Sequence, residues 1–156
     1  MIDISKTLEY ESGYSNDEND AGGETKYGIS KRQYPTLDIK NLTKEQAIEI
    51  YRKDFYERMN LNLIKPELEF VAWKLFDIGV NQGPGTAIRF LQNILDIKED
   101  GILGRDTATT INQYSDPKGL CQMLAIKQML RYTDIVIKKP SQLVFFKGWI
   151  KRALDY

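Results

Sequence analysis

The chain has 156 residues, of which 42% are hydrophobic and 28% charged, as is typical of one soluble globular domain. It contains 22 basic and 22 acidic residues, and this zero net charge argues against a basic protein that binds nucleic acid. Histidine is absent, which excludes serine–histidine and cysteine–histidine catalysis and every histidine-based metal site. The single cysteine, Cys121, rules out an internal disulfide and lies in an apolar run, so we expect it to be a buried small hydrophobic residue.

The first half of the chain combines helical patterns with one irregular segment. An apolar-patterned helix is expected around Ile4 and Leu8. From residue 12 to residue 30, glycines mix with acidic and amide side chains without a helical period, which predicts a loop or a short β-ribbon. Thr43 to Gln46 has the pattern of a capping box, after which Ala47, Ile48, Tyr51 and Phe55 recur on one helix face.

The second half of the chain is predicted to be helical almost throughout. After Pro66 apolar residues recur at helical spacing, and we expect Gly79 and residues 83–85 to break or bend this segment. Further helices are expected from Pro84 to about Leu95, from Asp106 or Thr107 to about Tyr114, from Pro117 towards Lys139, and from Ser141 to Tyr156. The fold class is therefore mainly α, with a short β-ribbon or irregular acidic loop near the N-terminus.

Carboxylates are the main candidates for acid–base chemistry. Five of them lie close together in the sequence: Glu11, Asp17, Glu18, Asp20 and Glu24. Glycoside hydrolysis uses one carboxylic acid to protonate the leaving oxygen, and often a second group to stabilise the transition state or activate water. Glu11 lies where the first helix would end, and a partly desolvated position of that kind keeps an acid protonated. From composition alone, however, the same residues also fit a solvated acidic turn.

Calcium binding is a second possible use of this acidic segment. Asp17, Asn19 and Gly22 match the start of an EF-hand loop. Ala21, however, replaces an oxygen ligand, and Gly28 stands where the bidentate glutamate belongs. We therefore expect no metal site and no cofactor.

Residues 11–30 resemble the signature of glycoside hydrolase family 108, which comprises N-acetylmuramidases related to phage endolysins and to secretion-activator proteins. The matching stretches are Glu11-Ser12-Gly13-Tyr14, Asn16-Asp17, Asp20, Gly22-Gly23-Glu24-Thr25 and Tyr27-Gly28-Ile29-Ser30. Ser12 departs from the glycine that is usual there. The resemblance continues through Asn41-Leu42-Thr43, Phe76-Asp77, Gly83-Pro84-Gly85, Asp100-Gly101 and the closing Phe146-x-x-Gly148-Trp149-x-x-Arg152, and so it spans nearly the whole chain.

This resemblance implies one lysozyme-like domain over residues 1–156. Residues 1–85 would form the catalytic region, and residues 86–156 a peptidoglycan-binding helical region packed on it. The implied reaction is hydrolysis of the bond between N-acetylmuramic acid and N-acetylglucosamine in peptidoglycan, as in a phage endolysin that lyses the cell wall. The alternatives are a peptidoglycan-binding module without hydrolytic activity and a wall-remodelling helper of a secretion system.

The resemblance also implies roles for particular residues. Glu11 matches the catalytic glutamate, while Asp20 and Thr25 match positions that help hold the attacking water in phage-type muramidases. Asp17 is the alternative to Asp20, and Thr25 has the alternative role of capping the following turn. The sequence does not decide between retention and inversion, because the separation of the carboxylates is a structural quantity.

Four further residues are candidates for substrate binding. Tyr14 and Tyr27 flank the acidic segment and are candidate platforms for sugar rings. Asn81 and Gln82 follow a helix, where exposed amides suit the N-acetyl and hydroxyl groups of a sugar, although Asn81 is also a candidate helix cap. Trp149, at helical spacing from Phe146, is expected to be a core residue and not a sugar contact.

The expected partner is the glycan strand of bacterial peptidoglycan, bound by a monomer, with no nucleic acid and no membrane insertion. The N-terminus lacks the basic and apolar pattern of a secretory signal. We therefore expect synthesis in the bacterial host cytoplasm without a signal peptide, and action in the periplasm or on the cell wall after release.

Overall fold

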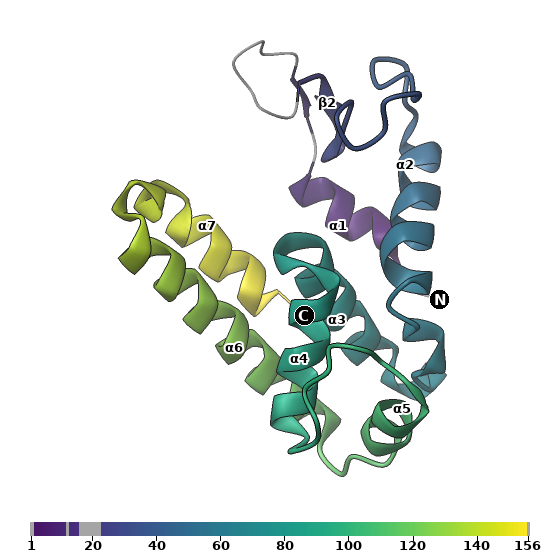
Figure 1. The fold of residues 1–156 in the computed structure, drawn as a ribbon, viewed down its shortest axis with the longest axis vertical. Helices are drawn as coiled ribbons and strands as arrows, with labels where there is room; N and C mark the ends of the chain where they lie inside the picture. The colour runs from purple at the N-terminus through teal and green to yellow at the C-terminus, as the bar shows by residue number, and fades with distance from the viewer. Residues whose placement is uncertain (1, 12, 16–22, 156) are drawn as a thin grey trace. The chain divides into compact units, whose positions relative to one another are not determined.

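The computed structural model describes residues 2–11, 13–15 and 23–155 (Figure 1). Two compact units divide the chain: the first is Asp3–Arg58, and the second is Met59–Tyr156 together with the first two residues. The mainly α fold expected from the sequence is confirmed, with a small antiparallel sheet near the N-terminus. In the described part of the chain, no helix has both the length and the apolar character needed to cross a membrane.

In the first unit, the three strands of a small sheet follow helix α1 in the sequence and precede helix α2. Helix α1 begins after Asp3, whose carboxylate accepts a hydrogen bond from the backbone N–H of Ser5 at 3.0 Å. Helix α2 begins at the predicted capping box, in which Thr43 and Gln46 each accept a hydrogen bond from the other's backbone N–H. The elements are α1 (Ile4–Tyr10), β1 (Tyr14–Ser15), β2 (Thr25–Lys26), β3 (Ile29–Ser30), α2 (Lys44–Tyr51) and a π-helical extension, η1 (Arg52–Glu57).

The second unit is built from helices. Pro84 occupies the first turn of its helix as predicted, and Asp116 caps the longest helix by accepting a hydrogen bond from the N–H of Gly119 at 2.9 Å. Pro140 lies just beyond the end of that helix. The elements are η2 (Leu61–Leu63), η3 (Pro66–Leu68), α3 (Glu69–Gln82), α4 (Pro84–Ile94), α5 (Arg105–Asn112), α6 (Pro117–Lys138), η4 (Pro140–Gln142) and α7 (Leu143–Leu154).

Of the two outcomes expected at Gly79, a break or a bend, the break does not occur, because α3 continues through it to Gln82. A Cβ atom at Gly79 would lie 2.5 Å from the Sδ atom of Met59, so glycine at this position makes room for a packed methionine. The helix ends instead at Gly83, whose φ of +96° is a conformation that side chains with a Cβ rarely adopt.

Helices α3 and α7 are joined by a buried ion pair. The guanidinium of Arg152 donates to both carboxylate oxygens of Asp77, over distances of 3.0 to 3.3 Å, and Asp77 is fully buried. Lys74, also fully buried, donates from Nζ to the backbone oxygen of Ala153. Burial lowers the pKa of Lys74 to about 8, although the nearby charge of Asp77 acts to raise it.

Cys121 is buried on α6, as the sequence predicts. Burial raises the pKa of its thiol to about 11. A thiol with a raised pKa holds little thiolate near neutral pH, so Cys121 is poorly suited to act as a nucleophile.

Candidate functional site

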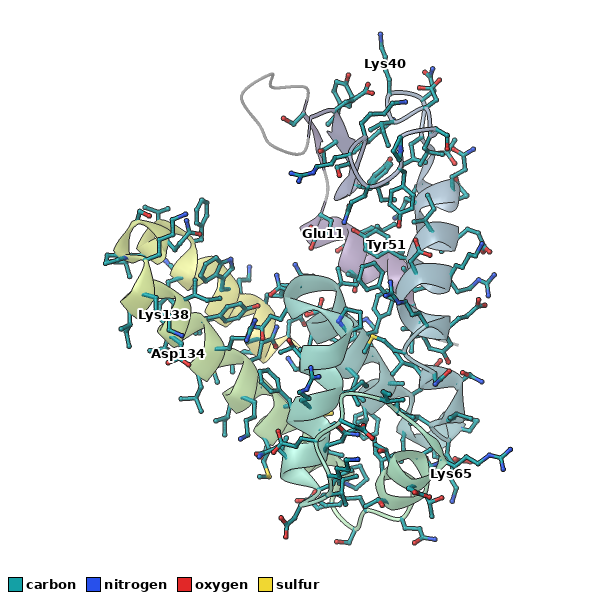
Figure 2. All side chains as sticks on the ribbon, in the orientation of Figure 1. Glu11, Lys40, Tyr51, Lys65, Asp134 and Lys138 are labelled. Atoms are coloured by element: carbon teal, nitrogen blue, oxygen red, sulfur yellow. The ribbon has the colours of Figure 1, made fainter. Side chains whose placement is uncertain are left out.

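Glu11 lies at the C-terminal end of α1, as the apolar pattern of that helix predicts (Figure 2). Its backbone N–H donates to the carbonyl oxygen of Leu8 at 3.2 Å and closes the last turn. Ile4 and Leu8, on the same helix, are buried, whereas Glu11 is only partly buried. The carboxyl group is therefore attached to a firmly packed helix but remains open to solvent.

The connection between β2 and β3 is a two-residue turn made by Tyr27 and Gly28. The pairing of Lys26 with Ile29 fixes its length. Tyr27 has a φ of +53° and Gly28 a φ of +71°, so both adopt the left-handed conformation that a type I′ hairpin turn requires. Glycine accepts this conformation readily, but tyrosine does so rarely, and such strain persists only where surrounding structure holds it.

Gly28 brings the turn close to Glu11 and to Tyr51 of α2. A Cβ atom at Gly28 would lie 3.1 Å from Oε2 of Glu11 and 2.6 Å from the hydroxyl oxygen of Tyr51. The buried Tyr51 donates its hydroxyl hydrogen to the carbonyl oxygen of Tyr27 at 2.9 Å. Tyr51 thus holds the turn in place beside the carboxyl group of Glu11, and Figure 2 shows these two residues on neighbouring helices.

The apolar pattern of residues 47–55 predicts only that Tyr51 lies on the buried face of its helix. The hydroxyl group of Tyr51 is the feature of the sequence that could have indicated a further contact, because a buried tyrosine hydroxyl normally has a hydrogen-bond partner. The identity of that partner, 24 residues earlier in the chain, follows from the fold and not from any local pattern.

The Gly28→Ala variant is expected to lower kcat by at least about tenfold, because the new methyl group would collide with Tyr51 and displace the carboxyl group of Glu11. Gly23→Ala is the matched control: Gly23 has a similar φ of +66°, but a Cβ atom there would meet nothing within 4 Å. Tyr51→Phe removes only the hydrogen bond to the carbonyl oxygen of Tyr27, so it should lower kcat by a smaller factor and leave KM unchanged. Initial rates of wall hydrolysis over a range of substrate concentrations test this, and equal losses for Gly28→Ala and Gly23→Ala would contradict it.

Two other predicted site residues lie in or beside the sheet. The hydroxyl of Thr25 donates to the carbonyl oxygen of Gly23 at 3.1 Å, and Thr25 pairs with Ser15 and Ser30 on the flanking strands. Exposed Tyr14 donates its hydroxyl hydrogen to Glu24 at 3.0 Å, and this hydrogen bond raises the pKa of Tyr14.

Several predictions fall outside the described residues. They concern the second carboxylate, Asp20 or Asp17, and the residues of the calcium-like pattern at 17, 19 and 22. The expected role of Asp20 or Asp17 and the expected lack of a metal site therefore stay predictions.

A pocket of about 220 Å³ lies in the second unit, where Asn81 and Gln82 form the last turn of α3. Its walls come from three helices, and it combines amide, cationic, aromatic and aliphatic groups. The lining residues are Asn81, Gln82, Arg131, Tyr132, Ile135 and Trp149.

Hydrogen bonds fix the amides at this pocket. The buried Tyr132 donates its hydroxyl hydrogen to Oδ1 of Asn81, and Gln82 donates from Nε2 to the backbone oxygen of Gln128 at 3.2 Å. Gln128 in turn donates from Nε2 to the hydroxyl oxygen of Tyr132 at 3.0 Å. Asn81 is therefore joined to α6, and Gly83 is the residue that caps α3. Oε1 of Gln82 is buried and has no hydrogen-bond partner among the described residues.

Trp149 lies at the edge of this pocket and not in the core, so the expectation of a core tryptophan is wrong. Its ring stacks on that of Tyr132, with centroids 5.1 Å apart, and on that of Phe145, with centroids 6.0 Å apart. Helix α7 turns Arg152 and Ala153 into the core, which leaves Trp149 partly exposed. Phe76, by contrast, is fully buried.

Two family models match the chain. One, described as Glycosyl hydrolase 108, matches residues 4–83, and the other, described as Predicted Peptidoglycan domain, matches residues 86–154. Among solved structures, the chain is similar to "Structure of Brucella abortus SagA", with a TM-score of 0.72 and 22% sequence identity over 96% of this chain and 86% of that one. At this identity the likeness concerns the fold. No curated protein sequence matches the chain.

Proposed function

This chain belongs to the glycosyl hydrolase 108 family, and we propose that it cleaves the bond between N-acetylmuramic acid and N-acetylglucosamine in peptidoglycan. The peptidoglycan region over residues 86–154 supports the bacterial cell wall as its partner. The single observation that supports the reaction best is the position of Glu11. Its carboxyl group is attached to a packed helix and lies against a strained turn that Tyr51 holds in place.

In this proposal Glu11 is the general acid. Its carboxyl proton passes to the glycosidic oxygen as the bond from that oxygen to the anomeric carbon of the muramic acid breaks. A water molecule then supplies the oxygen of the new hydroxyl group on that carbon, and the proton that this water gives up restores, in the net reaction, the carboxyl group of Glu11. Gly28 contributes by having no side chain, since the turn can then pass beside the acid without displacing it.

We propose that Asp20, with Thr25, positions the attacking water, and that Asp17 is the alternative carboxylate. Asp20→Asn is then expected to lower the turnover number with little effect on wall binding, while Asp17→Asn has the smaller effect on rate. The amide keeps the size of the side chain and removes its charge, so each exchange tests the carboxylate alone. Measured rates in the reverse order would assign the role to Asp17.

The pocket at the end of α3 is proposed to contact the glycan strand. Asn81 and Gln82 would bind N-acetyl or hydroxyl groups, Trp149 would offer a ring face to a sugar, and Tyr14 and Tyr27 would be platforms beside the sheet. This assigns Trp149 to binding, because the structure leaves it partly exposed in the pocket wall.

Trp149→Ala is therefore expected to weaken binding to insoluble peptidoglycan by several-fold to about tenfold, the scale of one aromatic stacking contact. Phe145→Ala is the control, since Phe145 stacks on Trp149 but does not line the pocket. Co-sedimentation with purified cell walls measures both. Equal affinity for wild type and Trp149→Ala would remove the tryptophan from the binding surface.

The main alternative is a module that binds peptidoglycan without cutting it. Incubation of the purified chain with purified cell walls separates the two functions, if soluble fragments and new reducing ends are measured together with binding. The proposed enzyme releases soluble fragments and forms new reducing ends. A binding module sediments with the walls and produces neither fragments nor new reducing ends.

The biological role is proposed to be endolysin-like lysis, with synthesis in the host cytoplasm and action in the periplasm or on the wall after release. The alternative role, a helper in a secretion system, uses the same chemistry. The genes beside this one distinguish the two, because a holin gene indicates lysis and a secretion operon indicates the helper.

A further inference from the structure

The turn between α6 and α7 exposes an unusual amount of apolar surface. Helices α6 and α7 pack side by side as a hairpin, joined by η4 (Figure 1). At this joined end Ile137, Leu143, Val144 and Phe145 have exposed fractions between 53% and 79%. Four large apolar side chains within nine positions form a cluster, and clustered exposed apolar side chains mark interaction surfaces more often than single ones do.

The same end of the hairpin is basic. Residues 135–147 include Lys138, Lys139 and Lys147 but no aspartate or glutamate, in a chain with a net charge of zero, and the nearest acidic residue in the sequence is Asp134, one helical turn before Lys138. Arg152 forms a buried ion pair with Asp77. Lys138, Lys139 and Lys147, by contrast, are exposed, and no carboxylate of the described residues forms an ion pair with them. Figure 2 shows Lys138 near the end of α6, where the chain turns towards α7.

We propose that this hairpin end, residues 137–147, docks on the surface of an anionic lipid bilayer. The four apolar side chains would enter the boundary between headgroups and acyl chains, while the lysines face lipid phosphates. The docking is peripheral: it involves one turn of the chain, and no helix among residues 2–11, 13–15 and 23–155 is long and apolar enough to span a bilayer.

The charge and the apolar character of this hairpin end favour a lipid surface over a second copy of the chain or a glycan strand. In a symmetric dimer formed through this end, the three exposed lysines of one copy would face those of the other, which opposes association. Glycan strands are polar, and the aliphatic side chains of Ile137, Leu143 and Val144 gain little against them. An anionic bilayer offers both an apolar layer and negative charge.

Co-sedimentation of the full chain with lipid vesicles tests the proposal. We expect binding to vesicles that contain phosphatidylglycerol, weakening as salt is added, and little binding to vesicles of phosphatidylcholine alone. Lys138→Gln with Lys139→Gln should weaken the binding by roughly 25-fold, at about fivefold for each lysine, whereas Lys138→Arg with Lys139→Arg should preserve it. Val144→Ser with Phe145→Ser should weaken it by more than about tenfold.

Ile102→Ser is the matched control, because Ile102 is a comparably exposed apolar residue in the connection between α4 and α5. This control should bind vesicles like wild type. Equal binding to both kinds of vesicle would overturn the proposal, as would a loss for Ile102→Ser as large as that for the hairpin variants. A dimer in light scattering that dissociates in Val144→Ser with Phe145→Ser, without vesicle binding, would assign the surface to self-association. Because the vesicles contain no peptidoglycan, the result is independent of the proposed hydrolysis.

Discussion

Glu11→Gln is expected to lower the rate of wall hydrolysis by about 10²- to 10⁴-fold while the thermal melt and the affinity for walls stay close to wild type. The amide preserves the shape of the side chain at the end of α1, but it has no proton to give to the leaving oxygen. The initial rate at which new reducing ends form measures the loss. The melt and wall co-sedimentation show whether the fold and the binding surface remain intact.

Glu9→Gln provides the control, because it makes the same exchange on an exposed residue two positions earlier on α1. It should retain the wild-type rate. A Glu11→Gln variant with more than about a tenth of wild-type activity would exclude Glu11 as the proton donor. A variant that loses its melting transition along with its activity would indicate a structural role instead.

Asp77→Asn is expected to destabilise the protein by about 3–5 kcal/mol, and by more than Arg152→Met does. Without Asp77, two buried cations, Arg152 and Lys74, lose the negative charge of a fully buried carboxylate, although Asp155 still acts on Lys74. Without Arg152, Asp77 still faces Lys74, so its charge is partly balanced. Chemical denaturation of the two variants measures the free energy of unfolding, and the order of the two losses is the informative result.

Arg52→Met is the matched control for this pair. Arg52 bridges Glu49 and Glu57 on the surface, and exposed bridges contribute little, so the melt should hardly move. If Arg152→Met cost more than Asp77→Asn, or if both behaved like Arg52→Met, the buried pair would not hold α7 on α3 as described.

The helix boundaries were predictable because their causes are local. The capping box at Thr43 and the Asp116-Pro117 start signal each act within one helical turn, and both begin helices in the structure. Gly79 could not be interpreted in this way, since its missing side chain accommodates Met59, which lies 20 positions earlier in the chain. Asp77 and Arg152 are 75 positions apart, and no periodicity along the chain connects them.

In the candidate site too, features with a local cause could be predicted from the sequence, and features that depend on distant segments could not. The position of Glu11 at a helix end could be predicted from the apolar pattern before it. The proximity of Glu11 to Gly28 and Tyr51 could not be predicted, because it depends on how the β2–β3 turn packs against α2. Trp149 has helical spacing typical of a core residue, yet the packing of α7 on α6 leaves it at a pocket.

Mass spectrometry of peptidoglycan digested by the purified protein shows which bond of the wall polymer is cut. Reduction of the products with borohydride before analysis marks the sugar at each new reducing end. We expect reduced N-acetylmuramic acid at those ends, in fragments whose peptides are intact. Reduced N-acetylglucosamine, or cleaved peptides with uncut glycan strands, would contradict it.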